Sequence, residues 1–221
     1  MKFMNLEELQ KESAKAGATL VAVSKTHTPE RILEIYEQGQ QDFGENKVQE
    51  LIDKVGELPE DIRWHMIGHL QTNKVRFIAP FISLIHSLDR ISLAKEINKQ
   101  GKRVGRIVPV LLQIKIARED SKFGIAPQEI DDFISTFRSK DYPFVKIKGV
   151  MGMATFTENE DMIRAEFQTL EKIFEHLKNS YFADDNEFEI RSYGMSSDYK
   201  IALETGSNMI RIGSLIFGAR S

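Results

Sequence analysis

The chain has 221 residues, of which 41% are hydrophobic and 29% are charged, as expected for a globular protein with one well-buried core. Thirty lysines and arginines against 33 aspartates and glutamates give a net charge of −3, which provides no strong field for binding nucleic acid or anionic lipid. The absence of cysteine excludes a disulfide scaffold, a thiolate nucleophile and a cysteine-based zinc site.

The first ten residues predict an amphipathic helix with acidic residues in its first turns, not the apolar region of a signal peptide. No apolar stretch approaches the roughly 20 residues that span a membrane. We therefore expect a cytoplasmic protein that contacts neither a membrane nor nucleic acid.

Residues 20–25, Leu-Val-Ala-Val-Ser-Lys, form a short apolar run that ends at Lys25. Such a run is typical of a strand buried on both faces, as parallel sheets require. Taken alone, Lys25 is best interpreted as the point where the strand meets water and its ammonium extends outward. The alternative is a partly buried amine that acts as a base or forms a Schiff base with an aldehyde.

The rest of the chain alternates between strand-like and helix-like segments. The next helix is predicted at 31–38, with Thr28 as its cap, Pro29 at its first position and Gly39 at its end. Further strands are predicted at 41–44, 63–67, 83–87, 106–114, 148–153, 188–193 and 209–212. Further helices are predicted at 47–55, 71–77, 89–99, 128–137, 160–178 and 198–205.

Eight strands separated by seven helices predict an α/β protein with one (β/α)₈ barrel domain over residues 1–221. A doubly wound open sheet is the main alternative, but it normally contains fewer units.

Two loops near the C-terminus have the character of a phosphate site, which barrels often build after strands seven and eight. Residues 192–198 place glycine and hydroxyl groups before a helix, and residues 211–214, Arg-Ile-Gly-Ser, place a cation and a glycine on the last strand. Ordinary helix capping by Ser197 or Asp198, and an internal salt bridge of Arg211, explain each loop separately. Their joint position favours a phosphorylated ligand. With Lys25 included, the pattern favours pyridoxal phosphate held as a Schiff base.

Other residue combinations are weaker. His65 and His69 straddle Gly68 and lack the neighbouring glutamate of a zinc helix, so we expect no metal site. Ser24 and Ser196 have no evident histidine and aspartate relay, so a serine hydrolase is not supported.

Seven segments resemble the pyridoxal phosphate homeostasis protein family, single-domain barrels related to the cofactor domain of alanine racemase (fold type III of the pyridoxal phosphate proteins). These segments are 22–25 (AVSK), 43–46 (FGEN), 65–74 (HMIGHLQTNK), 86–89 (HSLD), 121–124 (SKFG), 194–196 (GMS, with Asp198) and 211–214 (RIGS, with Phe217-Gly218).

This resemblance implies that Lys25 forms the Schiff base with pyridoxal phosphate. It implies that the side chain of Ser196 and the backbone amides of Gly213 and Ser214 hold the phosphate.

The same resemblance places Arg211 near the pyridine nitrogen, and Asn46 and Met151 at the mouth of the site. A permanent cation beside that nitrogen disfavours protonation of the ring, so the cofactor is a weak electron sink. Tyr193 and Lys47 depart from the residues common at those positions of the family.

Three functions remain open. The first is a carrier or buffer of pyridoxal phosphate in vitamin B6 and amino-acid homeostasis, without catalytic residues and with pyridoxal phosphate-dependent apoenzymes as possible partners. The second is a weak single-base racemase. In racemases a second domain supplies a tyrosine base and forms the dimer. Only three residues follow the last motif here, so we do not expect that domain, and we expect a monomer. The third is an enzyme acting on a phosphosugar or nucleotide with Glu45 and Asp89 as its acid and base.

Overall fold

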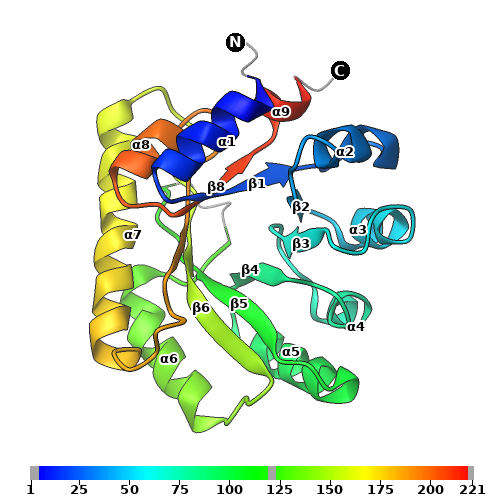
Figure 1. Ribbon diagram of the computed structural model, residues 1–221. Helices are drawn as coiled ribbons and strands as arrows, with labels where there is room; N and C mark the ends of the chain where they lie inside the picture. The colour runs from blue at the N-terminus through cyan, green and yellow to red at the C-terminus, as the bar shows by residue number, and fades with distance from the viewer. Residues whose placement is uncertain (1–4, 119–122, 219–221) are drawn as a thin grey trace.

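The computed structural model describes residues 5–118 and 123–218. Its eight strands are all parallel and form a closed barrel in chain order, with β1 hydrogen-bonded to β8. Figure 1 shows the strands at the centre and the helices around them. The strands are β1 (Thr19–Val23), β2 (Asp42–Glu45), β3 (Arg63–Met66), β4 (Leu84–Leu88), β5 (Val108–Gln113), β6 (Val145–Met151), β7 (Ile190–Ser192) and β8 (Met209–Ile212). The predicted (β/α)₈ barrel is therefore confirmed.

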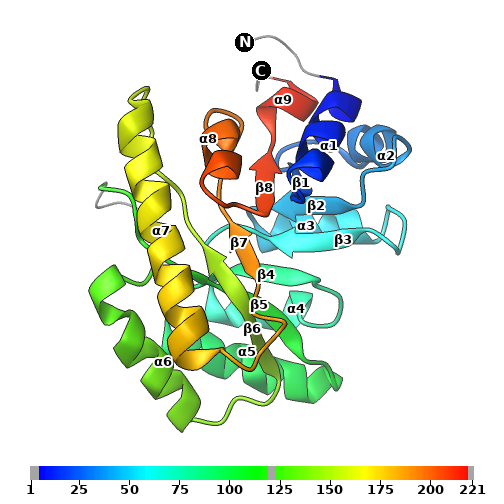
Figure 2. The same cartoon turned by 60° about the vertical axis from the view of Figure 1, so that its left-hand side comes forward.

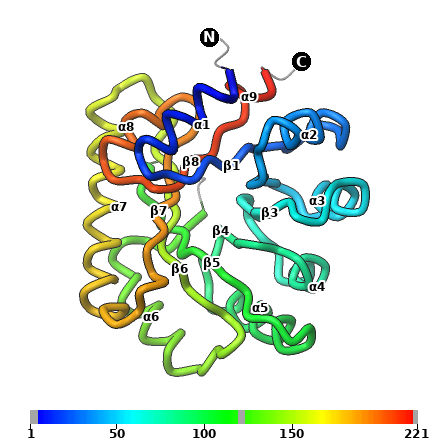
Figure 3. The backbone as a smooth tube through the Cα atoms, viewed as in Figure 1, coloured from blue at the N-terminus to red at the C-terminus, as the bar shows by residue number. Residues whose placement is uncertain are grey.

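The helices cover the outside of the barrel (Figures 2 and 3). They are α1 (Leu6–Lys15), α2 (Pro29–Tyr36), α3 (Val48–Val55), α4 (Val75–Ile78), α5 (Ile91–Val104), α6 (Ile130–Ser139), α7 (Glu160–Tyr181), α8 (Tyr199–Glu204) and α9 (Ser214–Phe217), with short 3₁₀ turns η1 (Thr72–Lys74) and η2 (Pro127–Glu129). No helix in the described ranges is long and apolar enough to cross a membrane.

Helix α2 begins as its sequence predicts. The Thr28 hydroxyl accepts a hydrogen bond from the Arg31 N–H, and Pro29 occupies the first helical turn. Gly39 follows the helix with a φ of 91°, a conformation that favours glycine. The residues that begin and end α2 therefore lie where the sequence predicts them, between β1 and β2.

Strand β6 differs from its predicted range of 148–153, since it begins at Val145 and ends at Met151. The reason is the alternation of its first residues. Val145 and Ile147 are buried, whereas Lys146 and Lys148 lie near the surface and form ion pairs with acidic residues after α7. Charged residues at every second position hid the start of the strand from a search for continuous apolar runs.

The core has two parts. A large cluster fills the space between strands and helices, and a smaller one lies inside the barrel. The buried members of the smaller cluster are Val21, Leu84, Leu111, Met151 and Met209. Side chains two positions along a strand from these residues also face the interior.

Candidate functional site

A cavity of about 370 Å³ opens at the carboxyl ends of the strands, the end at which barrels build their sites. Six of the seven residues expected to bind the cofactor line it together: Lys25, Asn46, Ser196, Arg211, Gly213 and Ser214. They come from the loops after β1, β2 and β7, from β8, and from the two residues that follow β8, the second of which begins α9. Chain segments almost 190 residues apart therefore converge on one ligand-sized space.

Lys25 lies in a turn two residues beyond the end of β1 and is half-buried at the cavity wall. The next residue, Thr26, has a φ of 70°, which is rare for a β-branched side chain. Its N–H donates to the Glu50 carboxylate over 2.9 Å. The turn after β1 is therefore held from α3, in a backbone conformation that threonine would not adopt by preference.

A buried ion pair lies beside this turn. Lys54 Nζ donates to Glu45 Oε1 at 2.7 Å and to the Ser24 carbonyl at 3.0 Å, and the Ser24 hydroxyl donates to Glu45 Oε1 at 2.6 Å. Glu50 completes the group, with an oxygen 3.8 Å from Lys54 Nζ. Burial raises the pKa of Glu45, although the hydrogen bonds from Lys54 and Ser24 oppose that effect. We call Ser24, Glu45, Glu50 and Lys54 the Lys54 cluster.

The two loops expected to hold a phosphate lie next to each other. The Gly213 N–H donates to Ser196 Oγ at 3.3 Å, which joins the loop after β7 to the end of β8. Asp198 sits at the first position before α8 but makes no capping bond to that helix; its carboxylate accepts the Met195 N–H instead. Gly194, with a φ of 97°, is required here because a Cβ would lie 2.5 Å from the Cβ of Ala202. Asp198 thus occupies the N-cap position of α8 without capping the helix through its side chain.

Arg211 lies on the cavity wall and is only 4% exposed. Its guanidinium donates to the Ser192 carbonyl (2.7 Å), to Ser192 Oγ (2.6 Å) and to the Gly152 carbonyl (3.0 Å). Burial lowers the pKa of Arg211 to about 10, while the charge of Asp198 acts in the opposite direction. The side chain is therefore a cation at neutral pH, held by neutral oxygens.

Asn46 and Met151 have different positions. Asn46 lines the cavity, and Gly68 packs so closely against it that a Cβ would lie 2.3 Å from the Asn46 carbonyl oxygen. Met151 is fully buried in the small interior cluster, and Met153 lines the cavity instead. Met153 reaches the mouth because it lies two residues beyond the carboxyl end of β6.

Several lining residues were not anticipated from the sequence. Among them, the His27 ring stacks on Phe217 with centroids 4.5 Å apart, and Phe156 is 86% exposed at the edge of the cavity. The only signal for His27 was its place two residues after Lys25.

The carboxylates proposed for a phosphosugar enzyme lie elsewhere. Glu45 belongs to the Lys54 cluster, and Asp89 pairs with His69 Nδ1 at 3.2 Å and with Arg90. Within residues 5–118 and 123–218, no carboxylate or phenol lines the cavity. An acid and base pair of this kind is not assembled there.

The histidines are also engaged with protein partners. His65, buried in β3, contacts Asp42 and His86, and His69 contacts Asp89. The described part of the chain holds no group of three or more histidines, cysteines, aspartates or glutamates that could bind a metal ion. In the matched segment 121–124, residues 121 and 122 lie outside the described residues.

Comparison with known proteins gives consistent results. The family model "alanine racemase, N-terminal domain" matches residues 3–221. The pyridoxal phosphate homeostasis protein of Aquifex aeolicus is 37% identical over 97% of this chain and 95% of its own length. PipY of Synechococcus elongatus, whose structure is known with and without pyridoxal phosphate, superposes without it at a TM-score of 0.86 with 32% identity, over 96% of this chain and 99% of that one.

An alanine racemase of Streptomyces coelicolor shares the fold at a TM-score of 0.75 with 15% identity, and the match covers 95% of this chain but 56% of the racemase. The match to the family model and the identity to full-length relatives show that this chain belongs to the alanine racemase N-terminal domain family and, within it, to the pyridoxal phosphate homeostasis proteins.

Proposed function

We propose that this protein binds pyridoxal phosphate as a Schiff base on Lys25 and serves as its carrier or buffer, without catalysis of its own. The observation that carries the proposal is the convergence of Lys25, Ser196, Arg211 and the Gly213–Ser214 backbone on one cavity. The structure of PipY with pyridoxal phosphate bound and the naming of the relatives as pyridoxal phosphate homeostasis proteins support the same ligand.

The residues fit the chemistry of this cofactor. The aldehyde needs an amine, the phosphate needs hydroxyl and amide donors, and the ring nitrogen needs a polar group. Residues of all three kinds lie on the cavity wall. When bound, pyridoxal phosphate supplies an electrophilic carbonyl and an electron-withdrawing ring. Arg211, a buried cation, disfavours a proton on the ring nitrogen and so weakens electron withdrawal.

The alternative is weak racemase activity. Racemisation by two bases needs a second proton donor opposite Lys25. Among the described lining residues, His27 is the one side chain besides Lys25 of a type that commonly serves as a general acid or base. His27→Ala therefore tests the alternative: any racemisation of alanine by the wild type that this variant loses would favour an enzyme.

The binding proposal is tested by incubating the protein with pyridoxal phosphate, recording the visible spectrum, reducing with borohydride and mapping the labelled peptide. We expect a visible band and label on Lys25, and neither in Lys25→Ala. Lys47→Ala is the matched control, since Lys47 lies near the cavity but is 77% exposed. Absence of the band, or label on scattered lysines that is unchanged in Lys25→Ala, would contradict the proposal.

A further inference from the structure

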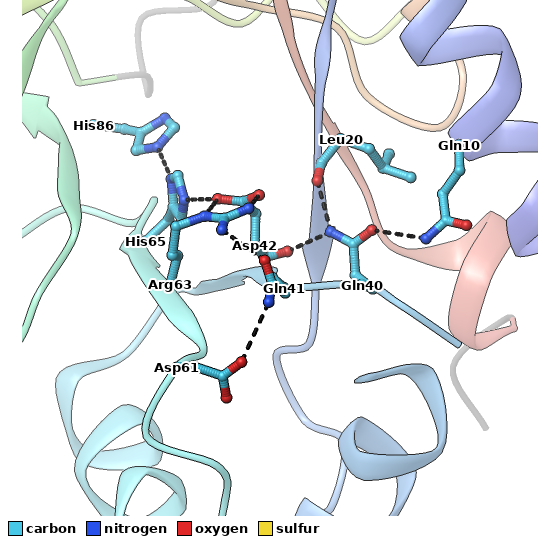
Figure 4. Close-up of polar contacts among 9 residues, drawn as sticks. All are labelled: Gln10, Leu20, Gln40, Gln41, Asp42, Asp61, Arg63, His65 and His86. Carbon is cyan, nitrogen blue, oxygen red and sulfur yellow. Dashed lines mark hydrogen bonds and ion pairs between the residues drawn. The ribbon is translucent and has the colours of Figure 1, made fainter. Parts of the chain in front are cut away.

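Five polar side chains form a continuous line of contacts through the barrel. His65 Nε2 lies 3.0 Å from Asp42 Oδ1, and His65 Nδ1 lies 2.9 Å from His86 Nε2. His86 Nδ1 lies 3.1 Å from Ser192 Oγ, which in turn accepts from Arg211 at 2.6 Å. Figure 4 shows the Asp42, His65 and His86 part of this line. We call Asp42, His65, His86, Ser192 and Arg211 the interior chain.

The interior chain crosses β2, β3, β4, β7 and β8 on the side where an apolar core is expected. His86, Ser192 and Arg211 lie two positions from Leu84, Ile190 and Met209, which pack inside the barrel. His86 and Ser192 are fully buried, and Arg211 and His65 are 4% exposed. Polar groups at such depth are costly unless they are hydrogen-bonded to one another.

Hydrogen positions can be assigned by counting donors. Arg211 can only donate, so Ser192 Oγ accepts from it, and the Ser192 O–H is left to donate to His86 Nδ1. A neutral His86 then has its proton on Nε2 and donates to His65 Nδ1. A neutral His65 likewise donates from Nε2 to Asp42, which is an acceptor only when ionised. All four bonds then run in one direction, from the cation to the anion.

Charge supports this assignment. Burial lowers the pKa of His86 well below its usual value, and the charge of Arg211 acts in the same direction, so this ring is neutral. Asp42 is held as an anion by Arg63 on its outer side, where the Arg63 side chain is 52% exposed. The chain thus starts at a buried cation and ends at an anion that also bonds to a partly exposed arginine.

We infer that Asp42, His65, His86 and Ser192 are positioning residues for Arg211: their one-way hydrogen bonds fix the plane of its guanidinium at the cavity wall and balance its charge through the barrel. The consequence for ligand binding rests on the proposed function, in which Arg211 faces the ring nitrogen of pyridoxal phosphate. In that setting the interior chain keeps the cation in place and the ring unprotonated.

The first test needs no cofactor. Nitrogen-15 NMR of histidine side chains in the full chain reports which ring nitrogen carries the proton, with the exposed ring of His176 as the surface reference. We expect neutral His65 and His86, both protonated on Nε2, at pH 7. We also expect Asp42→Asn to shift the signals of His86, which Asp42 does not contact directly. A proton on His86 Nδ1, a charged His65 ring, or an unchanged His86 in Asp42→Asn would overturn the inference.

The second test uses Ser192→Ala, which removes the hydroxyl between Arg211 and His86 but leaves the carbonyl that Arg211 also uses. Ser87→Ala is the matched control, because Ser87 is equally buried on β4 and its hydroxyl has no hydrogen-bond partner among the described residues. We expect Ser192→Ala to retain pyridoxal phosphate roughly tenfold less tightly, as for one lost hydrogen bond to a charged group, and Ser87→Ala to match the wild type. Equal retention in both variants would overturn the inference.

The two proposals can fail separately. If wild-type protein shows no visible band with pyridoxal phosphate, the proposed function fails, and the NMR experiment still decides whether the interior chain is directional. Circular dichroism shows whether Ser192→Ala folds. If it does not fold, Ser192→Thr takes its place. Because threonine keeps a hydroxyl at this position, we expect this variant to retain pyridoxal phosphate nearly as tightly as the wild type.

Discussion

Two buried polar networks flank the cavity, and they are built in opposite ways. The Lys54 cluster joins two full charges directly, Lys54 Nζ and Glu45 Oε1 at 2.7 Å, between neighbouring strands and α3. The interior chain separates its charges by two histidines and a serine, and it connects strands on opposite sides of the barrel. The first network holds backbone, the turn that carries Lys25, whereas the second holds one side chain, Arg211.

This difference has an energetic consequence. A direct buried ion pair is costly to break because removing one partner leaves an uncompensated charge. In the Lys54 cluster the second oxygen, Glu45 Oε2, has no hydrogen-bond partner within the described residues, so Glu45 depends heavily on Lys54. In the interior chain each buried ring bonds on both sides. The two networks should therefore respond differently to mutation and to pH.

The largest effect is expected for Lys54→Met. It leaves Glu45 buried without its cation, and the free energy of unfolding at pH 7 should fall by about 3 kcal/mol, the lower end of the range for broken buried pairs. The double variant Glu45→Leu, Lys54→Met should recover most of that loss. Urea unfolding followed by circular dichroism measures both.

The control for this change is Lys99→Met, which removes a lysine that is 71% exposed and 3.6 Å from Glu96. Its effect should stay below about 0.5 kcal/mol, as for most surface pairs. A loss of similar size in Lys54→Met and Lys99→Met would show that the ion pair beside the Lys25 turn contributes little to stability.

The contribution of the interior chain to stability should instead depend on pH. Burial raises the pKa of Asp42, but hydrogen bonds from Arg63 and His65 outweigh it and lower the pKa to about 2, from 3.8. Because this pKa is lower in the folded protein, the stabilisation is present above about pH 4 and is lost as the pH falls toward 2. It amounts to about 2 kcal/mol.

Asp42→Asn should therefore be less stable than wild type by about 2 kcal/mol at pH 7, and the two proteins should converge near pH 2. Urea unfolding at several pH values gives the difference. Asp132→Asn, at an exposed position in the first turn of α6, serves as control and should leave the acid dependence nearly unchanged. A gap between wild type and Asp42→Asn that is the same at every pH would rule out this role of the carboxylate.

The fold and the residues at the cavity could be predicted from the sequence, whereas the polar networks could not. The fold followed from the alternation of apolar strands and amphipathic helices, because that pattern is local. The shared position of Lys25, Ser196, Arg211, Gly213 and Ser214 at one cavity could be predicted because each stands in a short segment at a strand end, where a barrel places its chemistry.

The interior chain could not be assembled in this way. Its contacts join residues 21, 23 and 106 positions apart, and no spacing in the sequence encodes a bond across the barrel. One signal was available, since polar residues such as His65, His86 and Arg211 interrupt strands that are otherwise apolar. It shows that partners must exist, but not which ones. The placement of Met151 at the mouth rested on the resemblance alone, and in the structure Met153 lines the cavity while Met151 is buried inside the barrel.

The smallest expected effect concerns the turn that the Lys54 cluster holds. Thr26, at a φ of 70°, is strained, and glycine removes that strain while making the unfolded chain more flexible. The net gain for Thr26→Gly should therefore be small, up to about 1 kcal/mol. If the strain serves to present Lys25 to the cavity, the same variant should form the visible band with pyridoxal phosphate more slowly.

Asp141→Gly is the matched control, because Asp141 has a φ of 49° but precedes β6 at the opposite end of the barrel. Gains in stability in both variants with slower binding in Thr26→Gly alone would mark the turn as strained for function, whereas unchanged binding in both would reduce the Lys54 cluster to a purely structural element.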